Sequence, residues 1–531
     1  MNGYSSIWRL GITGLVLFFA VINLETTPPV WWDEGWTLTA ARNWVERGYY
    51  GPFLDGQPAA RGMEGAFSYT LPIAFSLRLF GVGVYQGRIV NVIFTFGTVT
   101  LLFLLASRLY NRSIALAALA VLVLMSPHVD IHPLLIGRQV LGEIPAMFFL
   151  LAGYTCLLLS GTVSAWFMGG AICFWSLGLV TKTQVPPFWA LSLIVPCILV
   201  LYERNWKLVG VLITGLVGSV ILWLGWKQLI LQFNSIPPPP VVGMTHLIAL
   251  AVDRHTRLVV LMETVRFGLP TLLGLSWVFC KYIRRRPKIT TYEDLIRVAF
   301  FVLSASWFVW YECLSLGWPR YLFPSAFVGS VFVAAMLWDW TNQFDLTCTF
   351  QRAASALTTF RFSREKLAAL ASVLLIVTSL GQTVKVLYGA YIVEPDTSIQ
   401  NVVRFLNTKT SPDSLIETYE SELFFLLHRR YHYPPDQVHA DLIRRNSFGQ
   451  RVNINYDPLA ANPDYLVVGP QSKFWDFYDP YLKTGSFRLL RDYSRYQIYE
   501  RVRLPSRSGN DQITDRAVMS AQAAEVSRPN R

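Results

Sequence analysis

The sequence predicts an α-helical membrane protein that crosses the bilayer about eleven times and carries an α/β domain near its C-terminus. Of its 531 residues, 53% are apolar and only 15% are charged. Soluble proteins carry about 25% charged residues, so the composition excludes an ordinary soluble enzyme. Apolar runs of roughly 15 to 25 residues recur along the chain and can cross a hydrocarbon layer of about 30 Å. After residue 394 these runs give way to short strand and helix patterns.

The first apolar run follows Arg9 and extends from Leu10 to Leu24. No small-residue cleavage site follows it, so we expect a retained first span rather than a signal peptide. The other expected spans lie near residues 86–108, 113–127, 139–159, 164–181, 184–202, 207–225, 267–283, 296–314, 320–338 and 367–392.

The positions of Lys and Arg predict the orientation. When the spans alternate across the bilayer, groups of cations near residues 108–112, 204–207, 281–288 and 352–366 fall on one side. The positive-inside rule makes that side cytoplasmic. We therefore expect loop 25–85 and residues 395–531 on the opposite face, with the protein in a cell inner (plasma) membrane and its active site extracytoplasmic.

The net charge of +12 does not indicate nucleic acid, because no basic block interleaved with aromatics is present.

Three parts are expected along the chain. Residues 1–394 form the membrane domain, which includes the outer loop 25–85. Residues 395–504 form an α/β domain, in which "DSLIETY" and "DYLVVG" predict strands, "ESELFFLLHRR" predicts a helix and "FRLLRDY" with "YQIYERV" predicts a strand pair. Residues 505–531 are polar and are expected to be disordered. We expect the α/β domain to be an accessory that shapes acceptor access.

The strongest local signal is "WWDEGWTL", which places Asp33 and Glu34 directly outside the first span, among Trp31, Trp32 and Trp36. A carboxylate pair at the membrane edge can bind a cation or remove a proton from a hydroxyl, and a low dielectric raises the pKa of at least one member. Adjacent side chains point in different directions, which predicts separate roles. The alternative is an aromatic belt with two solvated acids that cap the next helix.

An acidic Asp-Glu pair in the first outer loop, about eleven spans and an outer α/β domain together resemble the GT-C glycosyltransferases. The resemblance is to the branch that includes the protein O-mannosyltransferases and the aminoarabinose transferases of lipid A. Further stretches are similar to that family: "GRQVLGEIPAMFFLLAGY" with Arg138 and Glu143, "LGLVTKTQVPPF" with Lys182, and "GWPRYLFPS" with Arg320. The resemblance implies a polyprenyl-phosphate sugar as donor.

Arg138, Lys182 and Arg320 all fall at expected outer ends of spans. A polyprenyl-phosphate leaving group departs with negative charge at the lipid surface, and fixed cations there would stabilise that charge. We therefore predict that these three residues bind the donor phosphate. The alternative for each is an interfacial anchor whose charge reaches the headgroups.

Glu143 begins an apolar helix, where an ionised acid at bilayer depth costs about 2.5–3.5 kcal/mol. It is predicted to be an active-site carboxylate that faces Asp33. The alternative is an acid that interacts favourably with the helix N-terminus.

"SPHVDIHP" places His128, Asp130 and His132 within five residues. Ligands of these types suit a transition metal, so they are candidates for a divalent metal ion, although a polar outer loop is the simpler interpretation. No cofactor is otherwise indicated, because no phosphate-binding glycine loop or dinucleotide fingerprint is present.

The resemblance implies an inverting transferase that moves a monosaccharide from a polyprenyl-phosphate donor to an acceptor hydroxyl. Asp33 would be the general base, with Glu34 orienting the acceptor or a cation. The expected partners are the lipid-linked donor, a glycan, lipid or protein acceptor, and membrane lipids. The alternative function is a transporter or flippase of lipid-linked sugars, which would need ionisable residues near the middle of several spans.

Overall fold

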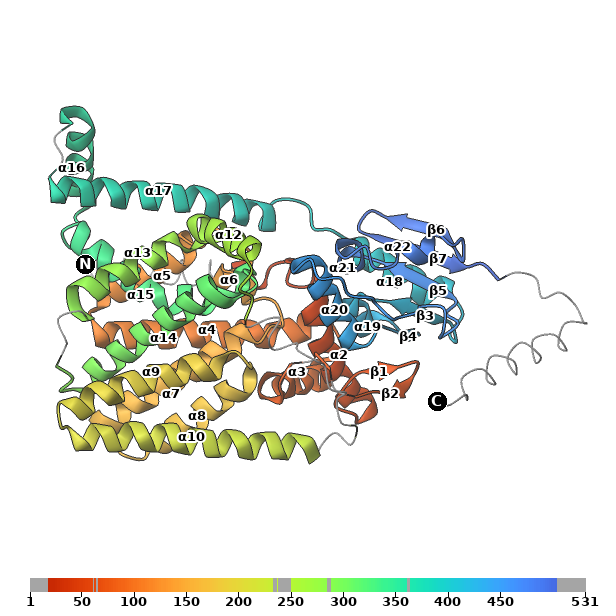
Figure 1. Ribbon diagram of the computed structural model, residues 1–531, viewed down its shortest axis with the longest axis horizontal. Coiled ribbons are helices and arrows are strands. Elements are labelled where there is room, and N and C mark those ends of the chain that lie inside the picture. The colour runs from red at the N-terminus through yellow and green to blue at the C-terminus, as the bar shows by residue number, and fades with distance from the viewer. Residues whose placement is uncertain are drawn as a thin grey trace, which may run out of the picture.

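The structure is a computed structural model that describes residues 18–60, 62–63, 65–232, 236, 250–283, 288–360 and 363–503. Long helices run side by side along the long axis of the molecule, and an α/β domain lies at one end of them (Figure 1). The sequence thus predicts the fold class correctly: the chain is a multi-pass helical membrane protein with a small C-terminal sheet domain. The expected disordered tail, 505–531, lies outside the described residues.

Within the described ranges, eight helical segments are long and apolar enough to cross a membrane. They are α4 (Val84–Leu109), α7 (Glu143–Thr162), α9 (Val185–Tyr202), α10 (Trp206–Gln232), the continuous run α12-η1-α13-η2 (Arg254–Glu263, Thr264–Gly268, Leu269–Val278 and Phe279–Ile283), α14 (Tyr292–Leu314), α15 (Phe323–Trp340) and α17 (Arg364–Tyr391). Two shorter apolar helices are α5 (Arg112–Leu124) and α8 (Phe167–Thr181). Each of these helices coincides with an expected span. Most of the first expected span precedes Phe18 and lies outside the described residues.

Polar caps fix where several helices begin at the end of the bundle far from the α/β domain. The side chains of Asn111 and Ser363 accept hydrogen bonds from the amides of Ile114 and Lys366 at the starts of α5 and α17. Thr291 forms a reciprocal capping box at the start of α14. Such caps satisfy backbone donors that the first helical turn leaves free.

The loop between the first apolar run and α4 forms α2 (Trp32–Arg47), a short hairpin of β1 (Phe53–Leu54) and β2 (Gln57–Pro58), and α3 (Phe67–Phe80). The remaining membrane-domain elements are α6 (Pro133–Ile136), η3 (Pro319–Tyr321) and α16 (Leu346–Thr359). Figure 1 shows α2 and α3 at the same end of the bundle as the α/β domain.

The α/β domain is built on a five-stranded sheet in the order β4-β3-β5-β7-β6. Its strands are β3 (Leu415–Thr418), β4 (Arg430–His432), β5 (Tyr465–Val468), β6 (Phe487–Tyr493) and β7 (Tyr496–Arg501). Strand β3 pairs in parallel with β4 and β5, whereas β7 pairs antiparallel with both β5 and β6. Its helices are α18 (Ser398–Lys409), α19 (Ser421–Leu426), α20 (Asp436–Ser447), α21 (Pro470–Phe474) and α22 (Asp479–Leu482). The expected strands and strand pair are confirmed. The expected helix at "ESELFFLLHRR" ends earlier, because the chain turns into β4.

The α/β domain and α2 share one apolar core. Trp32 and Trp36 of α2 lie in a buried cluster with Tyr419 and Phe424 of the domain. Gly35 is pressed so closely against the domain that a Cβ there would lie 2.3 Å from the Glu422 amide nitrogen, which requires glycine. The outer loop and the C-terminal domain are therefore packed as one unit.

Candidate active site

Asp33 and Glu34 lie in the first turn of α2, where the helix N-terminus favours negative charge. Neighbouring residues of an α-helix point about 100° apart, since each turn holds 3.6 residues. The two carboxylates consequently face different surroundings. One is directed to a cavity and the other to the protein interior.

Asp33 Oδ2 accepts a hydrogen bond from Arg320 Nη1 and forms an ion pair with it. The Asp33 side chain is 29% exposed, and the Arg320 side chain is 9% exposed. The guanidinium lies over two indole rings, with its carbon 4.9 Å from the centroid of Trp31 and 5.0 Å from that of Trp318. Indole faces attract cations, so the two rings help to hold Arg320 in place.

Glu143 and Lys182 form a second ion pair nearby. Glu143 begins α7, and Lys182 follows the last residue of α8 and donates to Glu143 Oε1. Glu143 is buried, whereas the Lys182 side chain is 22% exposed. Burial lowers the pKa of the Lys182 ammonium, while the Glu143 carboxylate acts against that shift. Glu143 Oε2 has no hydrogen-bond partner among the residues that the structure describes.

A cavity of about 860 Å³ brings Asp33, Lys182 and Arg320 together. Its full lining is Asp33, Lys182, Thr183, Gln184, Pro187, Phe188, Leu191, Leu250, Ser306, Val309, Trp310, Cys313, Leu314, Arg320 and Tyr321. Lys182 and Arg320 lie in the connections before α9 and α15, and Asp33 lies in the first turn of α2. Most of the apolar lining comes from α9 and α14. Leu191 and Val309 are exposed, so this apolar wall is open toward the lipid side of the bundle. The cavity is charged at one part of its wall and apolar along the helices.

Glu34 is separated from this cavity. Its carboxylate accepts from Arg88 Nε at 2.7 Å and Nη2 at 2.6 Å, and from the Val140 amide at 3.0 Å. Both side chains of the pair are 0% exposed. Arg88 also donates to the carbonyl oxygens of Leu24 and Pro28. With its oxygens held in this way, Glu34 does not face the cavity, contrary to the expectation that it orients an acceptor or a cation.

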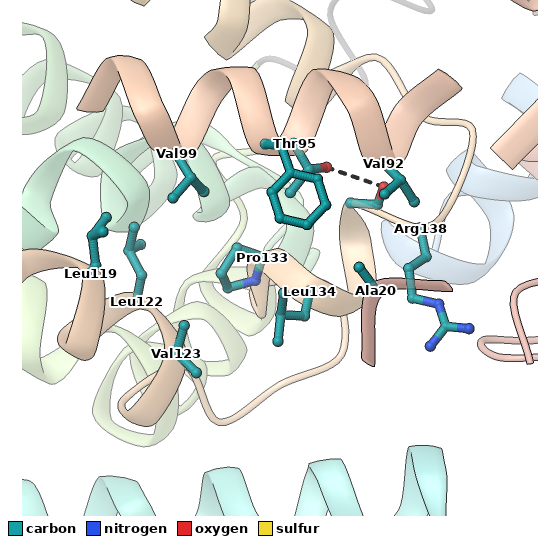
Figure 2. A pocket seen from close by; sticks show the side chains of 12 residues that line it. Ala20, Val92, Thr95, Val99, Leu119, Leu122, Val123, Pro133, Leu134 and Arg138 are labelled. Atoms are coloured by element: carbon teal, nitrogen blue, oxygen red, sulfur yellow. Dashed lines mark hydrogen bonds between the residues drawn. The ribbon is translucent and has the colours of Figure 1, made fainter. Parts of the chain in front are cut away.

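Arg138 is also separated from Lys182 and Arg320. It is buried and donates to the carbonyl oxygens of Phe19 and Ile22, and its guanidinium carbon lies 5.2 Å from the ring centroid of Tyr391. Figure 2 shows Arg138 at the edge of a small apolar cavity of about 70 Å³, with its guanidinium directed away from the apolar side chains. In this structure Arg138 ties the end of the first helix to α17 and is not grouped with the two other cations.

The three candidate metal ligands do not converge. His132 Nδ1 accepts from the Leu134 amide, and its other ring nitrogen hydrogen-bonds the Val123 carbonyl oxygen at 3.0 Å. Burial lowers its pKa to about 4, so the ring is neutral. His128 Nδ1 lies 3.9 Å from Asp130 Oδ2. Within the described ranges, no group of three or more His, Cys, Asp or Glu side chains is arranged to hold a metal ion.

Asp130 nevertheless lies close to the ion pairs. Burial raises the pKa of its carboxyl, the charges of His128 and Arg320 lower it, and those of Glu143 and Asp33 raise it. A metal ion at Asp33 or Glu143 would have to displace the guanidinium or the ammonium that now pairs with each carboxylate. The donor set therefore does not fit a preformed divalent-metal site.

Several contacts at this site were not predicted from the sequence. From the α/β domain, His439 stacks on Trp32 with ring centroids 4.6 Å apart, and the Tyr419 carbonyl oxygen accepts from the Trp32 indole at 2.8 Å. Neither residue stands in a recognisable motif. Arg88 could have been found as a cation within an apolar run, which requires a partner.

No family model matches the chain, and no curated protein matches it in sequence. Solved structures do match. ArnT from Cupriavidus metallidurans bound to undecaprenyl phosphate has 16% identity and a TM-score of 0.62, over 95% of this chain and 99% of that one. Its apo state has 17% identity and the same TM-score, over 94% and 99%.

A second match is the Archaeoglobus fulgidus oligosaccharyltransferase in its apo form, with 12% identity and a TM-score of 0.50 over 89% of this chain and 71% of that one. The same protein in complex with Zn and sulfate matches at 13% identity, with a TM-score of 0.50. At such low identity the likeness is one of fold. Both neighbours are GT-C glycosyltransferases, and this chain has the GT-C fold.

Proposed function

We propose that the protein is an integral-membrane glycosyltransferase that moves a monosaccharide from a polyprenyl-phosphate donor to an acceptor hydroxyl. The observation that carries the proposal is the cavity shared by Asp33, Lys182 and Arg320, whose remaining wall is mostly apolar. A lipid-linked phosphate needs cationic groups that bind the phosphate and an apolar surface that contacts the lipid chain. The GT-C fold and the ArnT neighbour bound to undecaprenyl phosphate support this choice.

In the proposed complex, Lys182 and Arg320 bind the donor phosphate. Charge-assisted hydrogen bonds from a guanidinium and an ammonium suit phosphate oxygens and stabilise the charge that develops as the phosphate departs. The prenyl chain would follow the apolar wall formed by Phe188 and Leu191 of α9 and Val309 of α14. This arrangement leaves the sugar beside Asp33.

The chemistry is a single displacement. The acceptor oxygen attacks the anomeric carbon, the bond from that carbon to the phosphate oxygen breaks, and the electron pair leaves with polyprenyl phosphate. Asp33 accepts the proton of the acceptor hydroxyl, and the anomeric centre is inverted. When phosphate takes over Arg320, the Asp33 carboxylate loses its present partner and becomes available as a base.

The other predicted site residues have supporting roles in this proposal. Glu143 holds Lys182 in position before the donor arrives. Glu34 and Arg138 stabilise the surrounding fold. Glu34 does so through its ion pair with Arg88, and Arg138 through hydrogen bonds to carbonyl groups of the first helix. The two cations supply the positive charge that a divalent ion would otherwise bring to the phosphate.

The alternative of a transporter or flippase is less well supported. It would need ionisable groups near the middle of several spans. The groups that line or adjoin the cavity lie instead near helix ends: Asp33 and Glu143 in first turns, Lys182 after α8 and Arg320 before α15.

We place the protein in a cell inner membrane with the cavity on the extracytoplasmic side, since the groups of cations predict the opposite side as cytoplasmic. The acceptor is a glycan, a lipid or a protein with a free hydroxyl. No role for nucleic acid is proposed.

The proposal is tested by incubating the purified full chain in lipid nanodiscs with a panel of polyprenyl-phosphate sugars and candidate acceptors. Release of polyprenyl phosphate that depends on Asp33 would support transfer. If no donor is consumed, but the wild-type chain in proteoliposomes moves lipid-linked sugars across the bilayer, the flippase alternative replaces the proposal.

A further inference from the structure

The α/β domain contacts the residue that precedes Asp33 from several directions. The Trp32 indole N–H donates to the Tyr419 carbonyl oxygen at 2.8 Å, and the Ser421 hydroxyl donates to the Trp32 carbonyl oxygen. The His439 ring stacks on the Trp32 indole at 4.6 Å with an interplanar angle of 23°. Side chain and backbone of Trp32 are thus both fixed by residues far away in the sequence. Figure 1 shows α2 against α19 and α20, the helices near these contacts.

His439 is itself held in place. Its Nδ1 forms a hydrogen bond with the Tyr419 hydroxyl, and the residue is buried. Burial lowers the pKa of His439 to about 4, so the ring that stacks on Trp32 is neutral near pH 7. The charges of Asp33 and Arg320 also act on this ring, which places it close to the cavity.

The fit on the other side of Asp33 is equally close. The backbone of α19 approaches Gly35 so tightly that any Cβ would meet the Ser421 and Glu422 backbone. Asp33 therefore lies between two positions, Trp32 and Gly35, that the α/β domain fixes. The Asp33 carboxylate can change its partner while its backbone stays in place.

We propose that His439 is a positioning residue for Asp33, acting through the Trp32 ring, and that the α/β domain is thereby a structural part of the active site. This inference rests on the proposed function, since it assigns His439 to the base of that reaction. The sequence-based expectation was an accessory domain that shapes acceptor access, and this inference adds a role for the domain in positioning Asp33. A displacement of reacting groups by about 1 Å can lower a rate by about 100-fold.

The first test measures transfer by three full-length variants in nanodiscs. His439→Ala removes the stacking ring and should lower kcat by about 10- to 100-fold, with the KM for the donor within about threefold of wild type. His439→Phe keeps a stacking ring and should restore kcat to within about fivefold of wild type. A histidine with only a general stabilising role would not separate kcat from KM in this way.

His432→Ala is the matched control. This histidine lies in the same domain, where its Nδ1 contacts Glu417 Oε2 at 2.6 Å and its ring stacks with Tyr456. Among the described residues, these contacts lie within the α/β domain and not with α2. Its replacement should leave kcat per folded molecule near the wild-type value. An equal loss of kcat in His432→Ala, or an unchanged kcat in His439→Ala, would overturn the assignment.

The second test does not depend on activity. Amide hydrogen exchange should rise in His439→Ala for peptides that cover Trp31–Trp36, and should not rise there in His432→Ala. If the wild type transfers no sugar, the proposed function fails, and exchange alone decides the positioning role. Unchanged exchange at α2 in His439→Ala, or a rise spread evenly over the whole sheet, would then overturn it.

Discussion

Two neighbouring acids of one helical turn form two very different ion pairs. Asp33 pairs with Arg320 through one guanidinium nitrogen, and its side chain is 29% exposed at the wall of a cavity. Glu34 pairs with Arg88 through two, and both side chains are fully buried. Both are carboxylate–guanidinium pairs, but solvent or a ligand can reach the Asp33–Arg320 pair and cannot reach the Glu34–Arg88 pair.

The difference in burial decides what each pair can do. A buried charge that loses its partner is strongly destabilising, so the Glu34–Arg88 pair is fixed and joins α2 to α4. Asp33 is 29% exposed at the cavity wall, so its carboxylate would not be left buried without a partner if a donor phosphate took its place on Arg320, as the proposed function requires. The comparison supports the proposal that Asp33 exchanges its partner and reacts, whereas Glu34 keeps its partner and stabilises the first turn of α2.

Among the variants proposed here, Asp33→Asn should have the largest effect, a loss of sugar transfer. Asn keeps the shape of the side chain but lacks the basicity, and loss of a general base lowers a rate by about 10²–10⁴-fold. Transfer rate per folded molecule checks this. Affinity for undecaprenyl phosphate should not weaken, because Arg320 loses a competing carboxylate.

Asp55→Asn is the control for Asp33→Asn. Asp55 belongs to the same outer loop and also pairs with an arginine, Arg430, but it is 48% exposed and does not line the cavity. Transfer should stay near the wild-type rate. Near-normal transfer by Asp33→Asn would remove Asp33 from the role of base.

Glu34→Gln tests the fixed side. It leaves the Arg88 charge buried without a counter-charge, so the free energy of unfolding should fall by about 3–5 kcal/mol. Thermal unfolding in detergent measures the loss. Should the single variant fail to fold, Glu34→Met with Arg88→Met should recover folded protein, since an apolar pair of similar volume is often tolerated. A stable Glu34→Gln protein that transfers no sugar would instead give Glu34 a direct catalytic role.

Lys182→Ala and Arg320→Ala should each weaken undecaprenyl-phosphate binding. A hydrogen bond to a charged group contributes about 1.5–3 kcal/mol, so a loss of roughly 10- to 100-fold in affinity is expected. Arg138→Ala is the contrasting variant, because its guanidinium holds carbonyl groups of the first helix. It should lower thermal stability more than affinity. A greater loss of affinity in Arg138→Ala than in the other two would return Arg138 to the donor site.

Chelation should have the smallest effect. Because Asp33 and Glu143 already pair with cations, EDTA should change the transfer rate by less than about threefold, a difference under 1 kcal/mol in the barrier. Full loss of transfer with EDTA, restored by one divalent ion, would show that a metal enters when the donor binds and that Asp33 exchanges Arg320 for that ion.

The sequence was sufficient for much of the fold. Apolar runs located the described membrane helices, since bilayer thickness sets the length of any crossing segment. Alternating patterns located β3, β5 and the β6–β7 pair. The short strand β4 was missed because "ELFFLLHRRYH" carries a helical pattern into a segment that the edge of the sheet makes extended.

Composition and local motifs by themselves determined the membrane class of this protein and marked Asp33, Glu143, Lys182 and Arg320, which the structure brings together. Only the tertiary structure decided that Glu34 forms a buried ion pair with Arg88 and that Arg138 donates to a carbonyl oxygen of the first helix. It also decided that the His439 ring stacks on Trp32. Periodicity depends on nearest neighbours along the chain. The direction in which a charged side chain points depends on which distant segments pack against it, and that is fixed only when the helices and the α/β domain close around one core.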